Sequence, residues 1–154
     1  MTKKNRQRWL QLTVLLGVLS SVMILLPALS VDDRAFNGFE IVFGKELVDL
    51  DFFGLGSVAS AKFLFNVWAL LAYGLPIVGA LILLIRPKLA LLSALSFIVS
   101  AVLMVILPDQ VPIQTTLLGN DNLIDVDWTL AYGAFIAMAL SGLAALGALR
   151  LSLS

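Results

Sequence analysis

The sequence predicts an all-α integral membrane protein: an antiparallel four-helix transmembrane bundle with a small ordered extracellular cap, for which a β-hairpin is one form. Three observations predict this class. Hydrophobic residues make up 60% of the 154 residues and charged residues only 13%, whereas soluble domains carry about 25% charged residues. Mean hydropathy is +1.03. Four long apolar runs divide the chain.

Each run is close to the roughly 20 residues that a helix needs to cross about 30 Å of hydrocarbon. The first run, followed by Ala28-Leu29-Ser30, also looks like a signal peptide, but it exceeds the roughly 7–15 residues of a signal-peptide core. We therefore expect one membrane domain, 1–154, with four spans. The predicted spans are residues 9–29, 63–85, 89–107 and 128–149, and the predicted outer loops are 30–62 and 108–127.

The positions of the charged residues predict the orientation. Lysine and arginine concentrate in cytoplasmic loops of membrane proteins. Seven of the ten cations fall on one side of the four spans, and three on the other together with all ten carboxylates. We expect a multi-pass protein of the plasma membrane with both termini in the cytoplasm and acidic loops outside. The seven cations are Lys3, Lys4, Arg6, Arg8, Arg86, Lys88 and Arg150.

The first outer loop is too apolar for a disordered linker. Phe39, Ile41 and Phe43 alternate with Glu40 and Val42, a pattern typical of a half-buried strand. A turn at Gly44-Lys45 followed by a return strand over 47–53 would complete a hairpin. The loop either seals the bundle or offers a surface to a partner or to lipid, and the candidate residues are Phe36, Phe39, Ile41, Phe43, Phe52 and Phe53.

Small residues and hydroxyls recur within the spans. In lipid, helices associate by close packing and interhelical hydrogen bonds, so such residues mark contact faces. The alternative is that they line a narrow polar path. Pro76, inside the second span, predicts a kink, either for packing or as a gating hinge. The small-residue positions are Ser93, Ser96, Ser100, Ala137, Ser141 and Ala145.

The sequence contains few indications of a catalytic, cofactor or metal site. The chain has no cysteine and no histidine, and its Lys and Arg do not outnumber Asp and Glu, so thiol chemistry and nucleic-acid binding are excluded. No catalytic motif occurs, no Asp, Glu, Lys or Arg lies in the middle of a span, and we expect no cofactor and no enzyme. Asp121, Asp125 and Asp127 are a weak candidate for a cation site, although Asp127 is also placed to cap the fourth span.

Two stretches carry a resemblance to known proteins: residues 36–44 after the first span, and residues 65–76 in the second. They resemble segments of small, uncharacterised four-span membrane proteins of Gram-positive-type bacteria, a resemblance that implies no functional residue. The loop layout is also similar to that of claudins. The paired cysteines and the Trp-rich loop motif of claudins are missing, so the similarity extends to layout only.

Three functional hypotheses remain. The first is a non-enzymatic accessory or scaffold subunit that binds a membrane-protein partner, or a second copy, through its outer loops and small-residue helix faces. The second is a small oligomeric transporter or channel with the Pro76 kink and the serine stripe of the third span near its path. The serine stripe consists of Ser93, Ser96 and Ser100. The third is a lipid-binding membrane protein that uses aromatic residues at headgroup depth, in addition to the bilayer contact that all four spans make.

Overall fold

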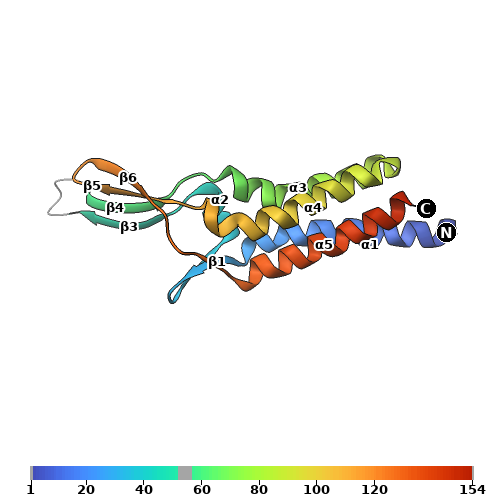
Figure 1. Ribbon diagram of the computed structural model, residues 1–154, viewed down its shortest axis with the longest axis horizontal. Helices are drawn as coiled ribbons and strands as arrows, with labels where there is room; N and C mark the ends of the chain where they lie inside the picture. Colours follow the sequence, from blue (N-terminus) through green and yellow to red (C-terminus); the bar gives the residue numbers. More distant parts are fainter. Residues whose placement is uncertain (1, 52–56, 154) are drawn as a thin grey trace.

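The computed structural model describes residues 2–51 and 57–153, and the side chains in these ranges except 49–51, 57 and 58. Within these ranges, four helices are each long and apolar enough to cross a membrane, in agreement with the four predicted spans and with a multi-pass membrane protein. They lie side by side, and both chain termini lie at the same end of them, here called the terminal end (Figure 1). The helices are α1 (Lys3–Val22), α3 (Val67–Ile85), α4 (Ala90–Ile106) and α5 (Tyr132–Ser152).

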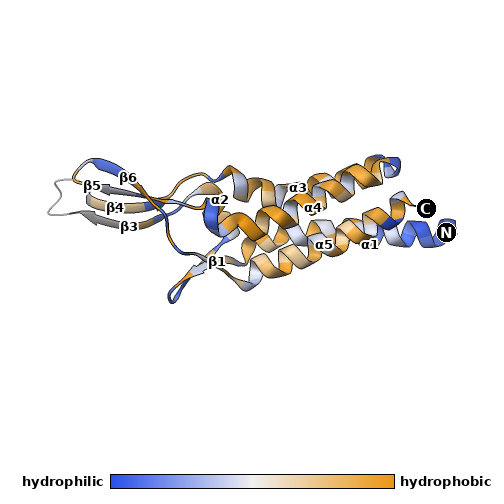
Figure 2. Cartoon of the chain, viewed as in Figure 1, coloured by the Kyte–Doolittle hydropathy of each residue, from blue (hydrophilic) through white to orange (hydrophobic). Residues whose placement is uncertain are grey.

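The helices form a ring in which α1 and α4 each contact α3 and α5. Alanine, serine and glycine fill the inside of the ring, while Leu, Ile and Val cover the outside. Figure 2 shows the apolar colour along the helices, interrupted by hydrophilic residues at the terminal end. Soluble proteins show the opposite distribution, with large apolar residues inside. The arrangement here suits a membrane, because lipid imposes no free-energy cost on an exposed leucine.

The ends of the spans differ from the predicted ones. The first helix begins at Lys3 and gives way to a short 3₁₀ turn, η1 (Met23–Leu25). Residues 27–29, expected at the end of the first span, belong to strand β1 (Pro27–Val31), and Phe63 ends strand β4 rather than starting a helix. The fourth helix begins at Tyr132 instead of Trp128. Apolar content alone does not separate a helix end from a short buried strand.

Two antiparallel sheets extend from the other end of the bundle, here called the sheet end (Figure 1). The smaller sheet has the order β2-β1-β7 and the larger one β3-β4-β5-β6. The segment between α1 and α3 contains β1 to β4, and the segment between α4 and α5 contains β5 to β7. The strands are β1 (Pro27–Val31), β2 (Arg34–Asn37), β3 (Glu46–Asp51), β4 (Ser57–Phe63), β5 (Ile113–Leu117), β6 (Asn120–Ile124) and β7 (Thr129–Leu130).

The predicted strand over Phe39–Phe43 was wrong, because Gly38–Phe43 forms a short helix, α2. Its start is a capping box: the Asn37 side chain accepts from the Glu40 N–H at 2.8 Å, and the Asn37 N–H donates to the Glu40 carboxylate at 3.1 Å. The predicted return strand exists as β3 in its described part, but it pairs with β4. Phe52 and Phe53 lie outside the described residues.

The β5–β6 hairpin was not predicted, since residues 108–127 were expected only to form the second outer loop. Its two-residue turn is Leu118-Gly119, in which both residues have positive φ, 50° and 82°. Such a turn matches the twist of a hairpin but favours Asn-Gly. Leu118 is 81% exposed at this turn. The run Ile113–Leu117, which is rich in β-branched residues, and the Gly119-Asn120 that follows it were the sequence features from which this hairpin could have been predicted.

Candidate functional site

Three aromatic side chains join the two sheets at the sheet end of the bundle. Phe36 contacts Phe63 and Trp128 edge-on, with ring centroids 5.1 and 5.7 Å apart, and Phe63 lies 5.5 Å from Trp128. All three are buried. The Trp128 Nε1–H donates to the Val111 carbonyl at 2.7 Å. The aromatic cluster therefore holds β2, β4 and the segment before β7 in one fixed arrangement.

A cavity of about 470 Å³ lies beside the aromatic cluster, between the β1–β2 turn and the larger sheet. We call it the sheet-junction cavity. Most of its lining is apolar, and its charged members come from the β1–β2 turn. Concave apolar sites with a few polar groups are the usual form of a binding site. The lining residues are Val31, Asp32, Asp33, Arg34, Phe36, Leu47, Val48, Ala61, Ile113 and Trp128.

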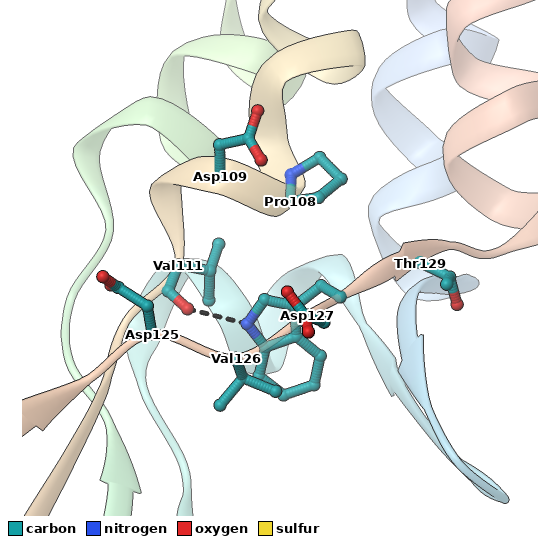
Figure 3. Close-up of a pocket in the computed structure, with 8 residues that line it drawn as sticks. Pro108, Asp109, Val111, Asp125, Val126, Asp127 and Thr129 are labelled. Atoms are coloured by element: carbon teal, nitrogen blue, oxygen red, sulfur yellow. Dashed lines mark hydrogen bonds between the residues drawn. The ribbon is translucent and has the colours of Figure 1, made fainter.

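A second cavity, of about 400 Å³, also reaches Trp128, and we call it the acidic cavity (Figure 3). Asp109 enters it from the 3₁₀ turn η3 (Leu107–Gln110), while Asp125 and Asp127 enter it from the segment between β6 and β7. These carboxylates are exposed, and none has an ion-pair partner among the described residues. Trp128 thus lines one mostly apolar cavity and one cavity flanked by three carboxylates.

The weak cation-site candidate finds no support in the described residues, where no group of three Asp or Glu side chains is placed to hold a metal. Asp121 lies on β6 and accepts from the Thr116 hydroxyl at 2.5 Å, and it does not line the acidic cavity. The expected capping role of Asp127 was wrong, because α5 begins five residues later with Ala131 as its N-cap.

The predicted partner or lipid surface separates into two groups. Phe36 and Ile41 are buried, 8% and 0% exposed, so neither belongs to an exposed surface, although Phe36 lines the sheet-junction cavity. Phe39 and Phe43 are more than half exposed, and their rings lie 4.5 Å apart on one face of α2. Within α2, helical spacing separates Phe39 and Phe43 from Ile41, because positions four apart share a face while alternate positions do not. Phe36 lies on β2 and is buried in the aromatic cluster.

The serine stripe is a set of interhelical hydrogen bonds. Ser93 donates to the Gly79 carbonyl at 2.6 Å, and Ser20 donates to the Ala137 carbonyl at 2.8 Å. Ser141 lies 2.7 Å from Ser20 and 3.3 Å from Ser100. Ser96 differs, because it donates to Leu92 of its own helix. Ala137 and Ala145 are buried beside these contacts on α5.

The Ser100 hydroxyl compensates for a backbone hydrogen bond that Pro76 removes from α3. Pro76 has no N–H to pair with the Ala72 carbonyl four residues earlier in α3. The Ser100 hydroxyl of α4 donates to that carbonyl at 2.6 Å. A neighbouring hydroxyl that pairs a carbonyl freed by proline is how spanning helices accommodate a kink. The contact favours a packing role for both residues over a hinge.

A phenyl ring fills the middle of the bundle, where a path would run. Phe97 of α4 is completely buried. A Cβ at Gly17 of α1 would lie 2.6 Å from the Phe97 ring, and one at Gly79 of α3 would lie 3.1 Å from it. The two glycines therefore make room for the ring between α1 and α3. This close packing argues against a permanent path beside the serines.

Ser100→Ala should lower the free energy of unfolding by about 1–3 kcal/mol, because the buried Ala72 carbonyl would lose its partner. Chemical denaturation in detergent measures this change. The matched control is Ser96→Ala, expected within about 0.5 kcal/mol of the parent. In a Pro76→Ala background the restored N–H can pair with Ala72, so Ser100→Ala should cost clearly less. Equal costs in both backgrounds would contradict the compensation.

No family model, curated protein or solved structure matches this chain. The resemblances to small four-span bacterial proteins and to the claudin layout therefore rest on the sequence alone.

Proposed function

We propose that this chain is a non-enzymatic accessory subunit of a membrane complex, and that it binds an extended basic segment of a partner protein at the sheet junction. The observation that carries the proposal is the position of Trp128 between the sheet-junction cavity and the acidic cavity. An apolar side chain of the partner would enter the first cavity. A neighbouring Lys or Arg would then lie near Asp109, Asp125 and Asp127.

Charge supports a basic partner. All ten carboxylates of the chain, but only three of its ten cations, belong to the segments of the sheet end. Complementary charge speeds encounter and selects between partners more than it raises affinity. The apolar contact at the sheet junction would then supply most of the affinity, as central buried anchors do in protein interfaces.

The proposal includes an orientation, with the sheet end outside the plasma membrane and both termini in the cytoplasm. The seven cations at the terminal end support it. Because the chain has no native cysteine, single-cysteine variants report without background. We expect a membrane-impermeant maleimide to label Leu118→Cys on intact cells and to label Lys4→Cys only after permeabilisation. The reverse pattern would overturn the orientation.

Binding can be measured with a ten-residue peptide of alternating Lys and Leu. The protein would carry Trp9→Phe and Trp68→Phe, so that Trp128 is its only fluorophore of this kind. In discs of zwitterionic lipid, we expect the peptide to change the Trp128 emission with a saturable dose dependence. The same peptide with Glu in place of Lys should not bind.

The carboxylates of the acidic cavity are tested with charge-neutral variants. Asp125→Asn with Asp127→Asn should weaken peptide binding about threefold to tenfold, since an ion pair with an exposed carboxylate contributes roughly 0.2–1 kcal/mol. The matched control is Glu46→Gln with Asp121→Asn, which removes two carboxylates that line neither cavity. Equal weakening by the two pairs, or equal binding of the acidic peptide, would refute the site.

A further inference from the structure

The terminal end carries a concentrated positive charge. Its cations come from the start of α1, the turn between α3 and α4, and the end of α5. The ten carboxylates of the chain all belong to the sheet end. In the described part of the chain, the one ion pair is Lys45–Glu40, also at the sheet end. The seven cations therefore have no carboxylate partner among the described residues.

Two of these cations border a recess between segments that are distant in sequence. A recess of about 220 Å³ lies between the first turns of α1 and Pro87 in the turn η2 (Pro87–Leu89). From α1 it is lined by Lys3, Arg6, Gln7 and Leu10. This spacing of three and four places the side chains on one face of the helix. Lys4 and Arg8 do not line the recess.

We propose that an anionic phospholipid binds here, with its phosphate held at the rim of the recess by Lys3, Arg6 and Gln7. Because the helices around it are long enough to span a membrane, the first residues of α1 and the last residues of α3 lie at headgroup depth. The walls of the recess are almost wholly apolar, so the ammonium group, the guanidinium group and the amide supply hydrogen-bond donors for phosphate oxygens at its rim. Leu10 and Pro87 add apolar contact for the glycerol and the first methylenes. Basic pockets between membrane helices are a recurrent form of headgroup site.

A second recess borders the same turn and suits an acyl chain. It measures about 210 Å³ and is lined by Val78, Leu81, Ile82 and Ile85 of α3, with Arg86 and Leu89 at the turn. Arg86 lines this second recess, and the next residue, Pro87, lines the first one. The turn therefore has a cationic residue and apolar side chains beside both recesses. The site is at the opposite end of the molecule from the sheet junction and does not depend on the proposed function (Figure 1).

Native mass spectrometry of the purified protein with added phosphatidylglycerol tests the site. We expect one phosphatidylglycerol to remain bound at concentrations where phosphatidylcholine does not. Lys3→Gln with Arg6→Gln should weaken binding about tenfold to thirtyfold, since each cation near a headgroup contributes about tenfold or less. The matched control is Lys4→Gln with Arg8→Gln, which removes the same charge from other faces of α1 and should change binding less than about twofold.

All four of the substituted residues are exposed, so both double variants should keep the unfolding temperature of the parent, and a thermal melt verifies this. Equal weakening by the two pairs would overturn the proposal, because binding would then follow net charge and not the recess. Equal retention of phosphatidylcholine would overturn it as well. If inorganic phosphate displaces the lipid at similar concentration, the recess is a site for free phosphate and the assignment to a phospholipid is wrong.

Discussion

Trp128→Ala is expected to lower the free energy of unfolding by about 3–5 kcal/mol, the usual cost of removing a buried Trp or Phe. The Trp128 ring contacts Phe36 and Phe63, and its Nε1–H pairs with the Val111 carbonyl. The variant would lose the packing and leave that carbonyl without its partner. Thermal unfolding monitored by circular dichroism, together with hydrogen exchange of the β1 and β5 amides, measures the change.

Two controls separate the contributions of Trp128. Trp68→Ala removes the same side chain where it is 45% exposed on α3, and we expect a cost below about 1 kcal/mol. Trp128→Phe keeps most of the ring and removes the hydrogen bond, so it should cost about 1–3 kcal/mol. If Trp128→Ala were no more destabilising than Trp68→Ala, the aromatic cluster would not be what holds the two sheets together.

Phe97→Ala is the second large effect, with an expected loss of about 2–3 kcal/mol. In lipid the transfer contribution of a soluble core is absent, because the bilayer is as apolar as the interior. The cavity contribution remains, at about 24 cal/mol per Å³ for the roughly 100 Å³ that the substitution empties. Denaturation in detergent measures the loss. Phe135→Ala, which removes a 50% exposed ring from α5, is the control and should cost little.

Ion flux measured on the parent protein tests the transport hypothesis. With Phe97 in place, we expect ion flux through reconstituted vesicles to stay at background under several gradients. A specific, saturable flux by the parent protein would contradict the accessory role. A loss of stability below about 1 kcal/mol for Phe97→Ala would show that the ring is not tightly held between Gly17 and Gly79, contrary to their close approach.

Much of the architecture follows from local composition. An uninterrupted apolar run of about 20 residues has no other low-energy solution than to cross a membrane as a helix. The four spans were therefore predictable from the sequence, and so was the concentration of cations near the chain ends and the α3–α4 turn. Each span depends on the free energy of transferring its own residues, without reference to any other segment.

Short segments are different, because their structure depends on distant residues. Residues 38–43 read equally well as a strand by alternation, and they became helix α2 through the Asn37–Glu40 capping box and the burial of Ile41 and Val42 against the bundle. The β5–β6 hairpin gains its place by pairing with β4, about 50 residues earlier in the chain. For segments of about six residues, tertiary contacts outweigh intrinsic preference.

The sequence by itself determined the membrane class, the number of spans and the separation of charge, since these depend on the composition of single segments. Only the tertiary structure decided which residues act together. It placed Ser100 against the carbonyl that Pro76 leaves unpaired, while Ser96, one turn away, pairs within its own helix. It also set Trp128 beside Phe36 and between two cavities. Contacts between residues about 90 positions apart have no local signature, because they form only when all the segments pack.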